Sequence, residues 1–269
     1  MLPVRTVLAL RAVLLLLAAT CAFAARAEVV DLPTRPGVTE RLIFLSPPAP
    51  RAAVVLLTGG DGDVLITPGG GARRGGNFLV RSRELFVQQG LAVAVVDAPS
   101  DRQSPPYLRG FRQTPEHVAD LAAVIAWLRE RTQAPVWLVG TSRSTQSVAY
   151  AGIALAGTPQ APDGIVLTST ILVDTKSRPV PAMPLQRLSM PVLVVHHVND
   201  GCDHCPFAET ATLMSRLTAA PRKELIPFEG GTAEGPPCEA HAYHGYNGIE
   251  AQVVQRIAEW LTQRGTVSR

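Results

Sequence analysis

The sequence carries almost no excess of charge of either sign. It has 25 lysines and arginines against 22 aspartates and glutamates. Three of the arginines, Arg5, Arg11 and Arg26, lie within the first 27 residues, which contain no acidic residue. The rest of the chain is therefore close to neutral, and its charge gives no indication of binding to nucleic acid or to an anionic membrane surface. We expect neither partner.

Long apolar runs are also absent, except near the N-terminus. Residues 12–24 are almost entirely apolar, follow two arginines, and precede the small-x-small triplet at residues 25–27. This run is well short of the roughly 20 residues that cross a bilayer. The pattern predicts a secretory signal peptide over residues 1–27, with an uncleaved anchor or a lipoprotein centred on Cys21 as alternatives. The protein is then periplasmic or secreted, without membrane association after cleavage.

No linker, repeat or low-complexity segment divides residues 28–269, so we expect one domain there. Apolar strand-like runs alternate with helical patterns, which indicates an α/β fold with a mainly parallel sheet flanked by helices on both faces. No insertion is long enough to form a large cap domain. The expected strands cover residues 52–57, 91–96, 164–167, 192–196, 224–228 and a run from residue 136, and the expected helices cover residues 78–89, 115–131, 142–156, 207–217 and 249–261.

Two predicted loops, residues 61–77 and 229–247, are long for a compact domain. Loops of this length usually take part in binding or catalysis. The first contains the glycine-rich segment 69–76, which lacks the lysine and the serine or threonine of a phosphate-binding P-loop. We interpret it as a mobile flap near the site, with Arg73 or Arg74 as a candidate contact for a substrate carboxylate. Four other arginines are expected to be mostly solvated charges: Arg81, Arg102, Arg109 and Arg112.

The most informative motif is the apolar run from Val136, which ends in the turn Gly140-Thr141-Ser142-Arg143. If the run is a buried strand and a helix follows, Ser142 lies at the tip of a sharp strand-to-helix turn, the geometry of a nucleophile elbow. The alternative is that Ser142 only caps the helix. A serine hydroxyl becomes a good nucleophile when a histidine removes its proton and a carboxylate orients that histidine. A catalytic Ser142 therefore requires both groups from elsewhere in the chain.

Asp200 and His244 are the candidates for these two groups. Asp200 follows the strand predicted at residues 192–196, and His244 follows the strand predicted at residues 224–228. The carboxyl ends of parallel strands meet at one edge of a sheet, so we expect both side chains beside Ser142. Asp200 could instead only form an Asn-Asp-Gly turn. Asp203 and Asp174 are alternatives for the acid, and His241 is the alternative for the base.

With Ser142, Asp200 and His244 in this order, the chain resembles the α/β-hydrolase superfamily over roughly residues 40–264. It is most similar to small exported members without a large cap, of the dienelactone-hydrolase-like and carboxylesterase-like kind. The sequence departs from the Gly-x-Ser-x-Gly motif at its second glycine, where Ser144 stands. Serine is small enough for a close approach of helix and strand, and we expect Ser144 to be structural.

The resemblance implies a serine hydrolase that cleaves a carboxylic ester or a related acyl bond through an acyl-enzyme. It also implies an oxyanion hole, in which the backbone N–H of Arg143 is one donor and that of Gly60 or Asp61 is the other. The implied partner is a small acyl substrate, and no cofactor or metal is implied. Ester, thioester, lactone and peptide bonds all suit this chemistry, and the oligomeric state is left open.

Three cysteines follow the predicted signal peptide: Cys202, Cys205 and Cys238. In an exported protein this odd number predicts one disulfide and one free thiol, with three pairings open. A bond from Cys202 or Cys205 to Cys238 would tether the loop of Asp200 to the loop of His244, and we favour Cys202 because it is nearer Asp200 in the sequence.

Two other classes of protein compete with the hydrolase hypothesis. Cys202, Cys205, His241 and His244 are residue types that form a tetrahedral zinc site, although an oxidising compartment favours a disulfide. A non-catalytic binding protein could also keep the same fold.

Overall fold

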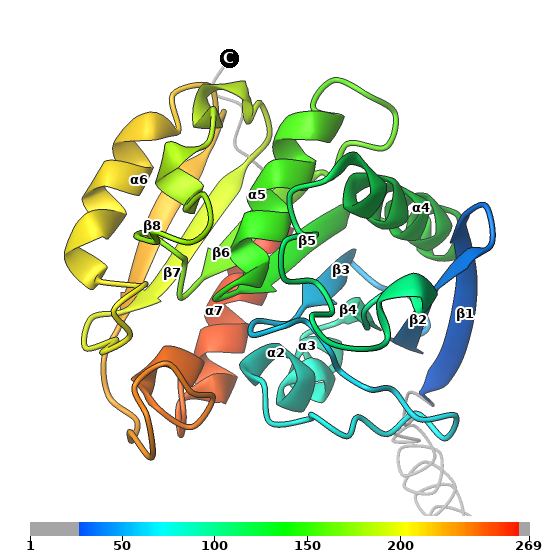
Figure 1. The fold of residues 1–269 in the computed structure, drawn as a ribbon, viewed down its shortest axis with the longest axis horizontal. Coiled ribbons are helices and arrows are strands. Elements are labelled where there is room, and N and C mark those ends of the chain that lie inside the picture. The colour runs from blue at the N-terminus through cyan, green and yellow to red at the C-terminus, as the bar shows by residue number, and fades with distance from the viewer. Residues whose placement is uncertain (1–26, 264–269) are drawn as a thin grey trace, which may run out of the picture.

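The computed structural model of this protein describes residues 27–263 (Figure 1). Its strands form one eight-stranded sheet in the order β1-β2-β4-β3-β5-β6-β7-β8. β1 and β2 pair antiparallel with each other, β2 pairs antiparallel with β4, and every other pairing is parallel. The strands are β1 (Glu28–Arg35), β2 (Val38–Leu45), β3 (Ala52–Leu57), β4 (Leu91–Val96), β5 (Val136–Thr141), β6 (Gly164–Thr168), β7 (Val192–His197) and β8 (Lys223–Phe228).

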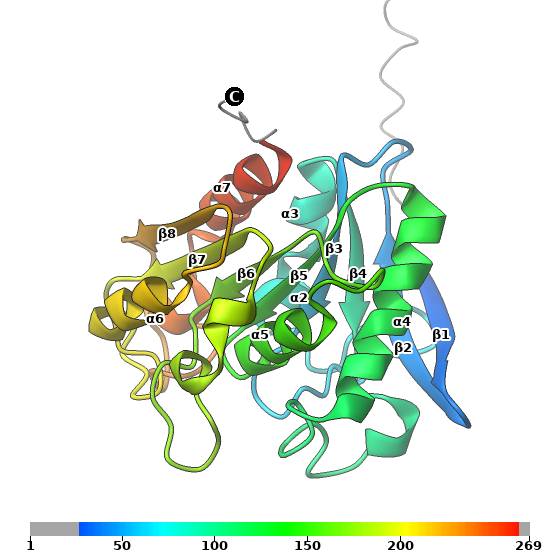
Figure 2. The same cartoon turned by 90° about the horizontal axis from the view of Figure 1, so that it is seen from above.

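Helices cover both faces of this sheet (Figure 2). The helices α4 (Pro115–Thr132), α5 (Ser144–Leu155) and α6 (Thr210–Arg216) lie on one face, and α2 (Phe78–Arg81), α3 (Arg83–Gln88) and α7 (Glu250–Thr262) lie on the other. Five short 3-10 turns complete the described elements: η1 (Ser100–Arg102), η2 (Val180–Ala182), η3 (Leu185–Arg187), η4 (Phe207–Glu209) and η5 (Tyr243–Gly245). The prediction of a mainly parallel sheet between two helical layers is confirmed.

The two faces have separate apolar cores because side chains alternate along each strand. In β3, Ala53, Val55 and Leu57 pack into the core under α4, α5 and α6, whereas Val54 and Leu56 pack under α2, α3 and α7. Strands buried on both faces are continuous apolar runs, and the sequence of the central strands shows such runs. This arrangement holds the carboxyl ends of β3 to β8 in fixed relative positions.

Two features of the fold differ from the sequence prediction. The antiparallel hairpin of β1 and β2 was not expected, since β1 contains Pro33 and its side chains are only partly buried, which weakens its apolar pattern. The helix expected over residues 78–89 is divided at Ser82 into α2 and α3. Neither difference affects the carboxyl ends of the parallel strands, where the sequence places the candidate site.

The predicted signal peptide lies outside the described residues, apart from Ala27. Within residues 27–263, no helix is both long enough and apolar enough to cross a membrane.

Candidate active site

Ser142 lies at a strained turn between β5 and α5. Its φ is 55°, in the left-handed region that side chains other than glycine seldom adopt, which indicates a constrained position. The backbone N–H of Ser142 donates to the carbonyl of Thr168 at the end of the neighbouring strand β6, with an N···O distance of 3.0 Å. Its side chain is half-buried at the carboxyl edge of the sheet. The turn thus has the geometry of a nucleophile elbow.

The close packing of this turn explains both Gly140 and Ser144. A Cβ atom at residue 140 would lie 2.7 Å from Cγ2 of Val148 and 2.8 Å from the carbonyl oxygen of Ser144, so only glycine fits. The buried Ser144 hydroxyl accepts from the amide of Thr141 at 2.8 Å and donates to the carbonyl of Leu57 at 2.6 Å. Where the common motif has a glycine, this chain uses a hydroxyl to join the turn to the end of β3.

Asp200 and His244 meet beneath the surface. Asp200 follows β7, His244 lies in η5, and the Oδ2 atom of Asp200 is 2.9 Å from Nδ1 of His244. Both side chains are at least 95% buried. The second nitrogen of His244, Nε2, is buried and has no hydrogen-bond partner among the described residues. One nitrogen of the ring is therefore held by a carboxylate, and the other is free.

The alternative acids and base lie in other environments. Asp174 forms an ion pair with Arg143 and a hydrogen bond with Ser177. Burial raises the pKa of Asp174, but hydrogen bonds from Ser177, the amide of Lys176 and Arg143 outweigh it and hold the pKa well below its usual range. Asp203 and His241 are exposed, and His241 contacts Asn247 across 3.5 Å.

The segment that carries His244 is fixed to the sheet by groups that the sequence did not single out. Tyr246 is fully buried, and its hydroxyl donates to the carbonyl of Val195 at 2.9 Å and accepts from the amide of Ser169 at 3.1 Å. The Ser169 hydroxyl donates to the carbonyl of His244 at 2.7 Å. Burial raises the pKa of Tyr246, so this hydroxyl keeps its proton. These bonds hold the histidine segment against the ends of β6 and β7.

Ser142 and His244 line one hollow of about 530 Å³, called the serine hollow below. Both long loops predicted from the sequence contribute to it, through Asp61, Asp63, Arg74, Gly76 and Asn77 of the first and residues 234–236 and 238–241 of the second. Arg74 is paired with Asp63 at 2.8 Å. Both loops therefore form walls of the hollow in which the candidate serine and histidine lie.

The segment after β3 also borders this hollow and approaches Ser142 closely. A Cβ atom at residue 59 would lie 2.9 Å from Cβ of Ser142, so the backbone passes the serine at a distance that only glycine permits. The amides of Gly60, Asp61 and Arg143 donate no hydrogen bond to any group in the described part of the chain.

Arg112 is a correction to the sequence prediction, which placed it in solvent. It is 6% exposed, and its Nη2 atom donates to the carbonyls of Thr58 at 3.1 Å and Gly60 at 3.0 Å, while Nη1 donates to the Ser147 hydroxyl at 3.2 Å. The N–H of a trans peptide points opposite to its carbonyl, so the amide of Asp61 points away from Arg112. Leu108 and Phe111, close to Arg112 in the sequence, are also buried.

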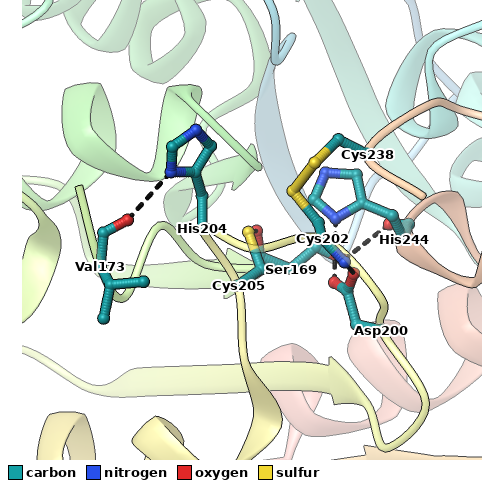
Figure 3. Close-up of a disulfide and its surroundings, with 8 residues drawn as sticks. All are labelled: Ser169, Val173, Asp200, Cys202, His204, Cys205, Cys238 and His244. Carbon is teal, nitrogen blue, oxygen red and sulfur yellow. Dashed lines mark hydrogen bonds and ion pairs between the residues drawn. A yellow bond between two sulfur atoms is a disulfide. The ribbon is translucent and has the colours of Figure 1, made fainter. Parts of the chain in front are cut away.

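A disulfide joins Cys202 to Cys238, as the sequence analysis favoured (Figure 3). Cys202 directly supports the acid as well, because its backbone N–H donates to Oδ1 of Asp200 at 3.0 Å. The disulfide therefore tethers the segment of Asp200 to the segment of His244. Cys205 keeps a buried free thiol.

The four-residue zinc site considered from the sequence does not form in this arrangement. Cys202, Cys205 and His244 have ligand atoms within 4.8 Å of one another, but His241 is not part of this group in the described residues. The sulfur of Cys202 is bonded to Cys238, and His244 is bonded to Asp200 through Nδ1. Burial also raises the pKa of the Cys205 thiol well above its usual value, which disfavours a thiolate ligand. The donor set present does not suit a structural zinc ion.

The disulfide closes a loop of 36 residues and should stabilise the fold by about 3 to 4 kcal/mol on the chain-entropy model. We predict that Cys202→Ser/Cys238→Ser lowers the free energy of unfolding by this amount in urea denaturation. Dithiothreitol should lower the wild type to the level of the double variant. The control Cys205→Ala keeps the disulfide, so its stability should still fall in dithiothreitol. Equal stability of the oxidised and fully reduced wild type would contradict the tether.

No model of a known protein family matches this sequence, and no curated protein matches it significantly. Solved structures do match. An esterase from Pyrococcus furiosus superposes with a TM-score of 0.62 at 12% sequence identity, covering 88% of this chain and 91% of that chain. A dienelactone hydrolase from Anabaena variabilis gives a TM-score of 0.58 at 17% identity, covering 88% and 97%. An esterase from Pyrobaculum calidifontis gives 0.58 at 18% identity, covering 97% and 93%.

These identities are low, and the likeness is one of fold. It extends over most of this chain and most of each neighbour. The sheet order, the helices on both faces and these neighbours agree, and the chain has the fold of the α/β-hydrolases.

Proposed function

We propose that this protein is a serine hydrolase that cleaves a carboxylic ester or a related acyl bond through an acyl-enzyme. The observation that carries the proposal is the buried pair of Asp200 and His244: His244 lines the same hollow as Ser142, and its Nε2 atom has no hydrogen-bond partner among the described residues. A carboxylate on Nδ1 fixes the tautomer in which Nε2 can accept a proton. Hydrogen bonds between catalytic groups often tighten only when substrate binds.

In the first half of the proposed reaction, the Oγ atom of Ser142 attacks the carbonyl carbon of the ester while Nε2 of His244 takes the hydroxyl proton. The carbonyl oxygen becomes an oxyanion in a tetrahedral intermediate. Asp200 stabilises the positive charge that forms on the imidazole. The bond between the carbonyl carbon and the alcohol oxygen then breaks, and His244 returns its proton to the leaving alcohol.

In the second half, water replaces the alcohol. His244 removes a proton from the water as its oxygen attacks the carbonyl carbon of the acyl-enzyme. The second intermediate collapses by breaking the bond to Oγ, and His244 returns that proton to Ser142. The products are one carboxylic acid and one alcohol, and the enzyme is regenerated. Besides the substrate and one water molecule, the proposed steps use side chains and amides of this chain.

The amides of Arg143 and of Gly60 or Asp61 are the proposed donors to the oxyanion. Their lack of partners among the described residues supports this role, and Asp61 is favoured because its N–H points away from Arg112. Donors that are already fixed cost no reorganisation during the reaction, and one such donor is typically worth about 3 kcal/mol. Arg112 is then a positioning residue that holds the segment after β3 in place.

The structural neighbours support the same reaction class, since two are esterases and one is a dienelactone hydrolase of the same fold. We also propose that the protein is exported as one domain after removal of residues 1–27. The Cys202–Cys238 disulfide favours an oxidising compartment.

We predict that Ser142→Ala lowers kcat for a short p-nitrophenyl ester by at least about 10³-fold, because the nucleophile is lost. The thermal unfolding midpoint should stay close to that of the wild type. Ser215→Ala, at an exposed position on α6, is the matched control and should keep full activity. An organophosphate or sulfonyl fluoride should label the wild type at Ser142. Unchanged turnover in Ser142→Ala, or absence of labelling together with bound zinc, would contradict the proposal.

The two histidines of the second long loop offer a direct comparison. His244→Gln should lower kcat by about 10³-fold or more, because the proton acceptor bonded to Asp200 is removed. His241→Gln should change kcat less than about tenfold, since this side chain is exposed and has no contact with Asp200. Steady-state kinetics on the same ester measures both. A larger loss in His241→Gln would transfer the role of base to that residue.

Arg112→Gln should lower kcat about 10- to 100-fold and change KM less than about threefold. The expected cause is a misplaced oxyanion donor, whose stabilisation exists only in the transition state. Arg112→Lys, which keeps the charge and can still donate to one carbonyl, should recover part of the loss. A rise in KM with unchanged kcat would show that Arg112 does not position the donor.

A further inference from the structure

A second hollow, of about 650 Å³, adjoins the serine hollow at Gly60 and Asp61, which line both. It is built by segments from the same edge of the sheet: the turn after β3, residues 106–113 after β4, the start of α5 and residues 176–178 after β6. Its cationic lining residues are Arg109, Arg112, Arg143, Lys176 and Arg178, and we call it the cationic hollow.

The ion pairs leave this hollow with an excess of positive charge. Arg109 is paired with Asp61, and Arg143 is paired with Asp174. The other three cations, Arg112, Lys176 and Arg178, have no carboxylate partner within residues 27–263. Positive charges that line one hollow raise the local concentration of anions there.

Arg112 is the innermost of these cations. A buried guanidinium without a carboxylate is costly, and its neutral acceptors on Thr58, Gly60 and Ser147 offset only part of this cost. Burial, with a smaller contribution from Arg143, lowers the pKa of Arg112 to about 9, which leaves it charged at neutral pH. An anion bound in the hollow would supply the missing countercharge.

Arg178 is held in place before any ligand binds. Its Nε atom donates to Oε1 of Gln113 at 2.9 Å, and its backbone carbonyl accepts from Gln113 at 3.0 Å and from the buried Gln146 at 2.8 Å. These bonds fix the segment 176–178 over the hollow. A pre-positioned guanidinium binds a carboxylate with little loss of conformational entropy.

The position of His244 decides which part of a substrate would reach this hollow. His244 must donate its proton to the leaving alcohol, so the alcohol part lies on the side of His244. His244 lines the serine hollow and is not among the residues that line the cationic hollow. Since the alcohol part is assigned to the side of His244, the acyl part is left free to extend toward the cationic hollow, which is lined by Gly60, Asp61 and Arg143.

We propose that the cationic hollow binds a carboxylate at the far end of the acyl group, so that the preferred substrates are monoesters of dicarboxylic acids. This inference rests on the proposed function, since it assigns the acyl side from the roles of Ser142 and His244. It narrows the substrate class from esters in general to esters with an anionic acyl part.

The test compares p-nitrophenyl monoesters of glutaric and adipic acid with neutral p-nitrophenyl esters of the same acyl chain length, after subtraction of spontaneous hydrolysis. The wild type should show a kcat/KM at least about tenfold higher for the anionic esters. Lys176→Gln/Arg178→Gln should lower kcat/KM for the anionic esters about tenfold or more and leave the neutral esters within about twofold. Arg187→Gln, an exposed cation outside the hollow, is the matched control and should change neither. Equal effects of the double variant on both ester classes, or a wild-type preference for the neutral esters, would overturn the proposal.

A binding measurement separates this proposal from the proposed function. Free glutarate or adipate, added to Ser142→Ala, should raise its thermal unfolding midpoint, and Lys176→Gln/Arg178→Gln in the same background should abolish the rise. If no ester is hydrolysed but this shift is found, the hydrolase proposal fails and the anion site stands. If esters are hydrolysed but neither dicarboxylate shifts the midpoint, the anion site fails and the hydrolase proposal stands.

Discussion

The buried hydrogen bond between Asp200 and His244 is the interaction on which the rest of the site depends. A buried histidine without a partner on Nδ1 would have no defined tautomer. Its Nε2 atom could then carry the ring proton itself and could not accept a proton from another group. The fold brings the two residues together across 44 positions of sequence, and it secures each of them separately. Cys202 supports Asp200 through its amide, and Tyr246 with Ser169 supports the segment of His244. The disulfide then links Cys202 to Cys238, in the loop that leads to His244.

The second constraint is the crowded backbone between β3 and β5. Gly59 passes Ser142 closely, Ser144 joins the elbow to the end of β3, and Arg112 holds the carbonyls of the same segment from the opposite side. Gly60 and Asp61, whose amides have no partner among the described residues, line both the serine hollow and the cationic hollow. On this account, one arginine positions the oxyanion donor and also contributes charge to the proposed acyl site.

Much of this arrangement follows from patterns that short windows of sequence contain. The run that starts at residue 136 and the runs at residues 192–196 and 224–228 predict parallel strands, and the residues after them must share one edge, which brings Ser142, Asp200 and His244 into one region. Burial of Arg112 could not be read in the same way, because it depends on contacts with segments some 50 residues away in the chain. The choice of Cys202 with Cys238 rested on their proximity to the two loops, and the spacing of the cysteines did not decide it. The hydroxyl of Ser144 has a partner on β3 that no local pattern indicates.

The central claim is that a covalent acyl group forms on Ser142 during turnover. The most direct measurement is acid quenching of the enzyme in the millisecond range during hydrolysis of a p-nitrophenyl ester, followed by mass spectrometry of the intact chain and of its peptides. The account predicts a species heavier by one acyl group, with the added mass on the peptide that contains Ser142. Turnover without such a species when deacylation is slowed, or an acyl group on a different residue, would contradict it.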